Sequence, residues 1–269
     1  METYRLKNIT ILILLLLNLF LLGLLLNFRC QQRHTSQELE QQLVRLFDYH
    51  GITLPEDLDA DAPSLTPMGV SRSLTDEAAI AAYLLEENAQ VEDQGGGIYT
   101  YTGAMGTVQF RSSGAFDYAP VSQDVSDPQA FFDGFLEAFG YQALSPSYSA
   151  NSGTFSAVRQ VEGYDVYNCT VSFRFSGQQL VSVAGSWVST AETAPLPQPS
   201  YTAADALSQF LEYRSESGVV CNSVISVQPA YALQSSTPST LQLSAKWQVV
   251  TDTYSYYVDC VTKEVQRIS

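Results

Sequence analysis

Residues 244–259 read SAKWQVVTDTYSYYVD, and this stretch decides the fold class of the chain. Apolar and polar side chains alternate along it, which is typical of antiparallel strands that place one face on a core. Residues 166–175, VYNCTVSFRF, show the same alternation earlier in the chain. Each stretch follows a segment with the pattern of an amphipathic helix. The sequence therefore predicts an α+β fold in which helices pack on antiparallel sheets.

The pattern of one helix followed by an antiparallel meander is predicted twice. In the unit 126–194, Ser126 caps a helix that runs to Phe139, and the strands are expected at 153–161, 164–175 and 179–188. In the unit 200–269, Thr202 opens a helix to about Arg214, and the strands are expected at 219–233, 241–251, 254–260 and 264–268. The two units are interpreted as an internal repeat.

Residues 29–125 are expected to form a juxtamembrane helix and an N-terminal α/β part. Ser36 to Tyr49 (SQELEQQLVRLFDY) carries an apolar stripe, formed by Leu39, Leu43, Leu46 and Phe47, and Gly51 ends the helix. A second helix is predicted from the cap Thr75 to about Asn88. A β-hairpin is predicted from strands at 98–102 and 107–111, after a glycine connector at 95–97.

Residues 9–28 form a mainly apolar run that no charge interrupts, after a short tip at 1–8. Twenty helical residues span about 30 Å, which matches the hydrocarbon core of a bilayer. A cleaved signal peptide would be shorter and would end in small residues, whereas this run ends in Asn27-Phe28-Arg29. Bulky or charged residues also precede Cys30, which disfavours a lipoprotein. The run predicts one retained transmembrane helix.

The part that follows the predicted span is strongly acidic, with ten basic and twenty-seven acidic residues after Cys30, a net charge of −17. Such a surface repels nucleic acid and anionic lipid, so no nucleic-acid partner is expected. Basic residues flank the span almost equally, but long domains translocate largely regardless of charge. We therefore expect a cytoplasmic N-terminus and an extracellular C-terminal domain.

The chain as a whole resembles a known family, and the shared residues lie mainly over residues 200–268. The polar-interrupted span ILILLLLNLFLL, the helix after it and the segments AADALSQFLEYR and AKWQVVTDTYSYYVDCVTKEV resemble the YycI/YycH family of Gram-positive bacteria. That resemblance implies a single-pass protein that regulates a cell-wall sensor histidine kinase of the WalK (YycG) type, with a paralogous single-pass regulator as a further candidate partner.

The C-terminal unit also resembles a PepSY-type, cystatin-like module, whose last hairpin typically reads W-x-V followed by Y-Y-V-D-A-x-T-G-E-V. The positions that fit are Trp247, Tyr257, Val258, Asp259, Thr262, Glu264 and Val265. Cys260 and Lys263 depart from it, standing where a small residue and a glycine are usual. Because glycine tolerates a positive φ, Lys263 is expected to change or strain this turn.

Asn18 is the residue singled out within the predicted span. An amide at mid-bilayer is costly unless it finds a partner, and a contact with another membrane helix supplies one. Leu14, Leu22 and Leu25 lie on the same face, and Gly23 allows close approach nearby. We expect this face to bind a partner helix. The alternative is a tolerated polar residue that bonds to its own backbone.

The sequence shows no motif of an enzyme, so no catalytic residue, metal or cofactor is expected. His34 and His50 stand near no motif-embedded nucleophile, and the pairs Asp76-Glu77 and Glu86-Glu87 are interpreted as solvated helix surface. Cys221 and Cys260 either bridge in an oxidising compartment or remain buried thiols. A further group of residues either forms a sugar- or peptide-binding face or belongs to the core: Tyr99, Tyr101, Tyr254, Tyr256 and Tyr257.

These observations lead to two functional hypotheses. The first is a membrane-anchored, non-enzymatic regulator of a sensor histidine kinase, which acts through its membrane helix and its outer domain. The second is a tethered module that binds a cell-wall component or inhibits a peptidase, with the helix as a mere anchor. The first requires the native span, whereas the second tolerates a foreign one.

Overall fold

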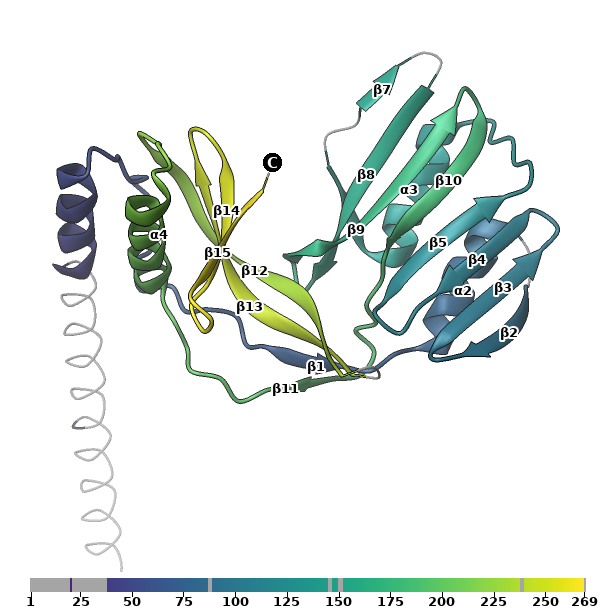
Figure 1. Ribbon diagram of the computed structural model, residues 1–269, viewed down its shortest axis with the longest axis horizontal. Coiled ribbons are helices and arrows are strands. Elements are labelled where there is room, and N and C mark those ends of the chain that lie inside the picture. The colour runs from purple at the N-terminus through teal and green to yellow at the C-terminus, as the bar shows by residue number, and fades with distance from the viewer. Residues whose placement is uncertain are drawn as a thin grey trace, which may run out of the picture.

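The computed structural model describes Phe20 and residues 38–86, 89–144, 147–149, 152–237 and 240–268. The predicted span 9–28, apart from Phe20, lies outside these residues. The described chain is a mixed α+β structure in two lobes that meet at their base (Figure 1). The central lobe is residues 71–190 and the C-terminal lobe is residues 38–66 and 200–268.

Among the described residues, three units of a helix followed by an antiparallel meander occur, one more than predicted. The first unit comprises α2 (Leu74–Leu85), β2 (Gln90–Gly95), β3 (Ile98–Gly103), β4 (Gly106–Phe110) and β5 (Ala115–Pro120). The second comprises α3 (Pro128–Phe139), β6 (Tyr141–Ala143), β7 (Ser147–Ser149), β8 (Ser152–Val161), β9 (Tyr164–Ser176) and β10 (Gln179–Ser186). The third comprises α4 (Ala203–Ser217), β12 (Val224–Thr237), β13 (Thr240–Thr251), β14 (Ser255–Asp259) and β15 (Glu264–Ile268).

Polar side chains fix where the helices begin. Ser73 rather than Thr75 caps α2, and Asp127 rather than Ser126 caps α3, because these side chains accept from the backbone N–H three residues later. Thr202 caps α4 as predicted. It forms a capping box in which Asp205 accepts in turn from the Thr202 backbone N–H.

The first two units join edge to edge to form the central lobe. Strand β5 pairs antiparallel with β10, so that the strand order is β2-β3-β4-β5-β10-β9-β8. Helices α2 and α3 lie together on one face of this sheet (Figure 1). The core between sheet and helices is strongly aromatic, with Phe110, Phe132, Phe135 and Phe173 fully or almost fully buried.

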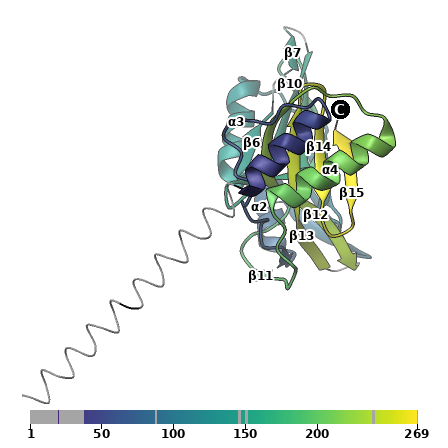
Figure 2. The ribbon, with the colours of Figure 1, turned by 90° about the vertical axis from the view of Figure 1, so that its left-hand side faces the viewer.

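The third unit forms the C-terminal lobe together with a helix over residues 38–49. Strands β12, β13, β14 and β15 are consecutive antiparallel neighbours. Figure 2 shows helix 38–49 and α4 crossing on the same face of this sheet. The residues expected as one N-terminal part, 29–125, therefore divide between the two lobes where the structure describes them.

Short strands and one parallel contact connect the lobes. Strand β1 (Met68–Val70) lies between β13 and β11 (Thr193–Pro195). Strand β12 pairs parallel with β9 at Tyr231↔Val166. A third hydrophobic cluster fills this base, with Val166, Tyr231 and Leu243 almost fully buried in it. The base is thus a packed junction with its own core.

Candidate functional site

Helix 38–49 is docked into the core of the C-terminal lobe. Its predicted apolar stripe turns Leu43 and Phe47 inward, where they are 4% and 0% exposed. They join a cluster with Phe210 on α4 and Trp247 on β13. Leu46, expected in the same stripe, is 42% exposed instead, because a stripe of 3.6-residue period reaches the core at positions 39, 43 and 47.

The chain after this helix is fastened to the same lobe by backbone hydrogen bonds. At the end of the helix, the Ile52 N–H donates to the Phe47 carbonyl at 2.9 Å. Thr53 donates to the Asn222 carbonyl and accepts from the Val224 N–H, both at 2.9 Å. A second set binds the start of α4: Ala203 N–H to Ala62 O at 3.1 Å and Ala204 N–H to Ala60 O at 3.0 Å. Helix 38–49 is therefore an integral part of the C-terminal lobe.

The last hairpin of the lobe carries a buried ion pair. Lys246 donates to an oxygen of Asp259, and both residues are 6% exposed. The other Asp259 oxygen accepts from the backbone N–H groups of Val261 and Thr262, at 2.8 and 3.1 Å. Burial raises the pKa of Asp259, but these hydrogen bonds outweigh it and hold the pKa below the ordinary 3.8. Asp259 thereby shapes the turn between β14 and β15.

Lys263 ends this turn with a φ of +61°, the left-handed conformation expected where the resembling module has glycine. A side chain in that conformation is strained, so the predicted strain of this turn is confirmed.

The junction between the lobes depends on side chains of β9. The Asn168 amide donates to the Leu233 carbonyl at 2.8 Å and accepts from the Leu233 N–H at 2.7 Å, as a neighbouring strand would. Beside it the rings of Tyr167 and Tyr257 stack with centroids 3.8 Å apart. Asn168 was not predicted to have a role; a polar amide within the alternating stretch VYNCTVSFRF is the signal that marks it.

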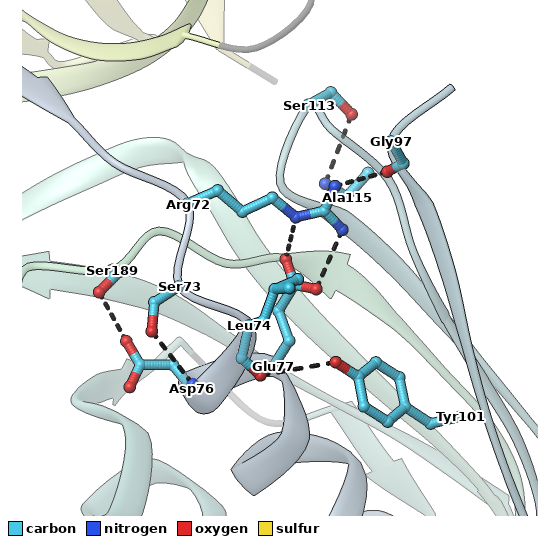
Figure 3. A network of polar contacts seen from close by, with 10 residues as sticks. All are labelled: Arg72, Ser73, Leu74, Asp76, Glu77, Gly97, Tyr101, Ser113, Ala115 and Ser189. Atoms are coloured by element: carbon cyan, nitrogen blue, oxygen red, sulfur yellow. Dashed lines mark hydrogen bonds and ion pairs between the residues drawn. The ribbon is translucent and has the colours of Figure 1, made fainter. Parts of the chain in front are cut away.

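A polar network in the central lobe fixes the start of α2 (Figure 3). Arg72 donates to both Glu77 carboxylate oxygens, at 2.6 and 2.9 Å, and to the Gly97 carbonyl at 2.5 Å. Ser189 donates to Asp76 at 2.6 Å. Burial raises the pKa of Glu77 above the ordinary 4.5 despite the Arg72 hydrogen bonds. The prediction that Asp76 and Glu77 form solvated helix surface is wrong for Glu77. This side chain is 3% exposed and is bound by Arg72.

The predicted partner-binding residues Leu14, Asn18, Leu22, Gly23 and Leu25 all lie outside the described residues. Within the described ranges, no helix is both long and apolar enough to cross a membrane. The membrane span and its binding face thus stay predictions.

The tyrosines considered as a binding face divide between the two lobes. Tyr101, Tyr256 and Tyr257 are buried, which confirms the core alternative for these three, whereas Tyr254 is 45% exposed. The bridge considered between Cys221 and Cys260 is not formed, and both are free thiols. In the described part of the chain, no three His, Cys, Asp or Glu side chains gather as a metal site requires.

No family model and no curated protein matches the chain. Among solved structures it is similar to the Bacillus megaterium YpeB C-terminal domain, at 15% identity and a TM-score of 0.32, over 75% of this chain and 100% of that one. It is also similar to an uncharacterized protein from Eubacterium rectale ATCC 33656, at 12% identity and a TM-score of 0.41, over 80% and 85% of the two chains. Membership of the YycI/YycH family stays a prediction.

Proposed function

We propose that the chain is a membrane-anchored, non-enzymatic regulator of a cell-envelope sensor histidine kinase. The observation that carries this proposal is the docking of helix 38–49 through Leu43 and Phe47 into the C-terminal lobe. A regulator needs a rigid connection, because a packed helix transmits a displacement of the domain to the segment before it, which a flexible tether does not.

The energetic demand on such a regulator is modest. A coupling of about 1–3 kcal/mol shifts a kinase equilibrium roughly five- to 150-fold. The removal of a fully buried phenylalanine costs about 3–5 kcal/mol. Since Phe47 is 0% exposed, the free energy of its packing exceeds the coupling free energy that regulation requires.

An insertion experiment separates regulation from tethering. An eight-residue Gly-Ser insertion after Ser36 leaves the lobe and the span intact but breaks their mechanical connection. The measured quantity is phosphorylation of the cognate response regulator in cells that carry the insertion. We expect the effect of the chain on phosphorylation to be lost. The same insertion after Gly96, in an exposed turn between β2 and β3, is the matched control and should leave the effect unchanged.

If regulation survives the insertion after Ser36, the helix is only an anchor. The proposal then fails in favour of a tethered binding or inhibitor module.

A further inference from the structure

A row of amide and tyrosine side chains crosses the sheet of the C-terminal lobe. Gln228 on β12 pairs directly with Gln248 on β13. Gln248 pairs in turn with Tyr257 on β14, and Tyr257 with Gln266 on β15. Directly opposed residues of antiparallel strands place their side chains on one face. Since Trp247, next to Gln248, packs in the cluster of α4, the row lies on the other face, which is turned toward the central lobe (Figure 1).

The central lobe contacts this row through Tyr167 on β9. Its ring stacks on that of Tyr257 with the centroids 3.8 Å apart, and its hydroxyl donates to the Gln266 side chain at 3.1 Å. Next to Tyr257 in the row, Gln248 lines a cavity that has walls from both lobes. The stacked tyrosines therefore stand at one side of this cavity.

The cavity has a volume of 390 Å³, within the roughly 300–1,000 Å³ of ligand-binding pockets. Its polar walls are formed by Gln142, Gln160 and Asp165 of the central lobe and by Gln228 and Gln248 of the C-terminal lobe. Among the described residues that line it, only Asp165 carries a charge. The cavity therefore offers mainly neutral hydrogen-bonding groups.

Several of these groups have no hydrogen-bond partner in the described part of the chain. The Gln160 side-chain N–H groups donate to the side-chain oxygen of Gln142 and, at 3.0 Å, to the Asp165 carboxylate. This leaves the Gln160 side-chain oxygen as an acceptor and the Gln142 NH₂ group as a donor. Across the cavity, the side-chain amides of Gln228 and Gln248 bond to no other described group. Unused donors and acceptors thus alternate along both walls.

These groups select an uncharged ligand that is rich in hydroxyl groups. A hydroxyl donates and accepts at once, so it pairs with either end of a glutamine amide. A charged ligand would lose its water and meet a single charge, the Asp165 carboxylate, which already accepts from Gln160. Anions are further disfavoured by the net charge of −17 after Cys30.

The backbone beside the cavity does not offer a ladder to a peptide strand. Strand β9 lies along this side of β12, where Tyr231 pairs with Val166 and the Asn168 amide holds the backbone of Leu233. Pro229, which lines the cavity, has no N–H to donate. A ligand in the cavity therefore bonds to side chains, which favours hydroxyl groups over a peptide backbone.

Tyr164 supplies an apolar surface in the same cavity. Its side chain is 37% exposed and lines the cavity together with Pro229. The face of an aromatic ring is electronegative and attracts C–H groups, which carry a slight positive charge. A sugar ring presents C–H groups on its faces and hydroxyl groups around its rim. It therefore matches both the tyrosine and the glutamines.

We propose that this cavity binds an uncharged sugar unit. Its hydroxyl groups are held by the glutamine amides of both lobes, and one face of its ring lies on Tyr164. Because Gln160 belongs to the central lobe and Gln228 and Gln248 to the C-terminal lobe, a bound sugar ties the two lobes together. This site goes beyond the proposed regulation of a kinase and does not depend on it, since sugar binding is measured without a kinase.

A glycan array tests the proposal, with the full chain in phosphatidylcholine nanodiscs, which carry no sugar. The array presents neutral and acidic oligosaccharides. We expect binding to neutral oligosaccharides and not to acidic ones. The dissociation constant of the neutral oligosaccharide that binds most tightly is then measured by titration calorimetry for the wild type and for the variants below.

Two double variants provide the matched comparison. Gln228→Ala/Gln248→Ala removes two amides of the cavity and should weaken binding about tenfold or more. Gln234→Ala/Gln242→Ala removes another cross-strand pair from the same two strands, which does not line this cavity, and should leave binding unchanged. The proposal is overturned if no neutral oligosaccharide binds, if acidic ones bind as tightly, or if the two double variants bind alike.

Tyr164 is tested by a second pair of variants. Tyr164→Phe keeps the ring and should retain binding, whereas Tyr164→Ala removes it and should weaken binding several-fold. Unchanged binding in Tyr164→Ala, or an equal loss in both variants, would overturn the placement of the sugar on this ring.

Discussion

Replacing Phe47 with alanine removes the largest side chain that helix 38–49 buries in the C-terminal lobe. Phe47 is 0% exposed and packs in a cluster that includes Phe210 and Trp247. Removal of a fully buried phenylalanine costs about 3–5 kcal/mol, the sum of lost burial and of the cavity left behind. Since about 1.4 kcal/mol is a factor of ten, the docked state should become roughly a hundred- to several-thousand-fold less stable.

Amide hydrogen exchange followed by mass spectrometry measures this loss of stability separately for each lobe. The hydrophobic cluster of α2 and α3 is separate from the one that contains Phe47, so exchange should accelerate in residues 38–49 and α4 but not in the central lobe. Tyr49→Ala, at a side chain 85% exposed, is the control and should leave exchange unchanged. Unchanged protection of residues 38–49 in Phe47→Ala, or an equal loss in both lobes, would refute the docking of this helix as the key contact.

Three further changes test the hairpin and the junction. Lys263→Gly should stabilise the C-terminal lobe by about 1 kcal/mol in chemical denaturation, because glycine adopts the φ of +61° without strain. Lys246→Met should cost about 3–5 kcal/mol by leaving the Asp259 charge buried and unpaired. In the wild type, the low pKa of Asp259 stabilises the lobe above pH 3.8, and this stability is lost as the pH falls through the folded-state pKa. In Lys246→Met the charged carboxylate is buried without its partner, so its protonation by acid should stabilise the lobe. Asn168→Ala should cost about 1–3 kcal/mol and speed exchange of the Leu233 amide, since it removes two hydrogen bonds.

Two of these changes have a comparison variant that separates their cause from a general loss of stability. Glu264→Gly, one position after Lys263 and within β15, should destabilise the lobe. The double variant Lys246→Met/Asp259→Leu should recover most of the stability lost in Lys246→Met, because no unpaired charge remains. An unchanged acid profile in Lys246→Met, or an unchanged Leu233 amide in Asn168→Ala, would contradict the roles given to those side chains.

Local sequence patterns predicted the elements whose residues carry their own signals. Thr202 with Asp205 marks the start of α4, and alternation in SAKWQVVTDTYSYYVD marks β13 and β14. The turn at Lys263 followed from a missing glycine. These signals are short-range, because caps, turns and alternation depend on neighbouring residues.

Packing between segments far apart in the chain could not be predicted from local sequence patterns. Strand β2 (QVEDQG) is exposed throughout at an edge of the sheet, so it shows no apolar alternation and was not predicted. The pairing of β5 with β10 and the packing of helix 38–49 on α4 join segments that are far apart in the chain. A cavity lined by Gln160 of the central lobe and by Gln228 and Gln248 of the C-terminal lobe was not predicted for the same reason, since its walls come from both lobes.

The proposed function is that this chain regulates a sensor histidine kinase through its predicted membrane helix, while helix 38–49 is docked in the C-terminal lobe. Co-purification in mild detergent from the native host tests it most directly, with the full chain, the same chain with an unrelated helix in place of residues 9–28, and Asn18→Leu. We expect a sensor histidine kinase to accompany the full chain, to be lost with the foreign helix and to be reduced by Asn18→Leu. If no kinase is found, or if the foreign helix retains it fully, the chain does not regulate a kinase through residues 9–28.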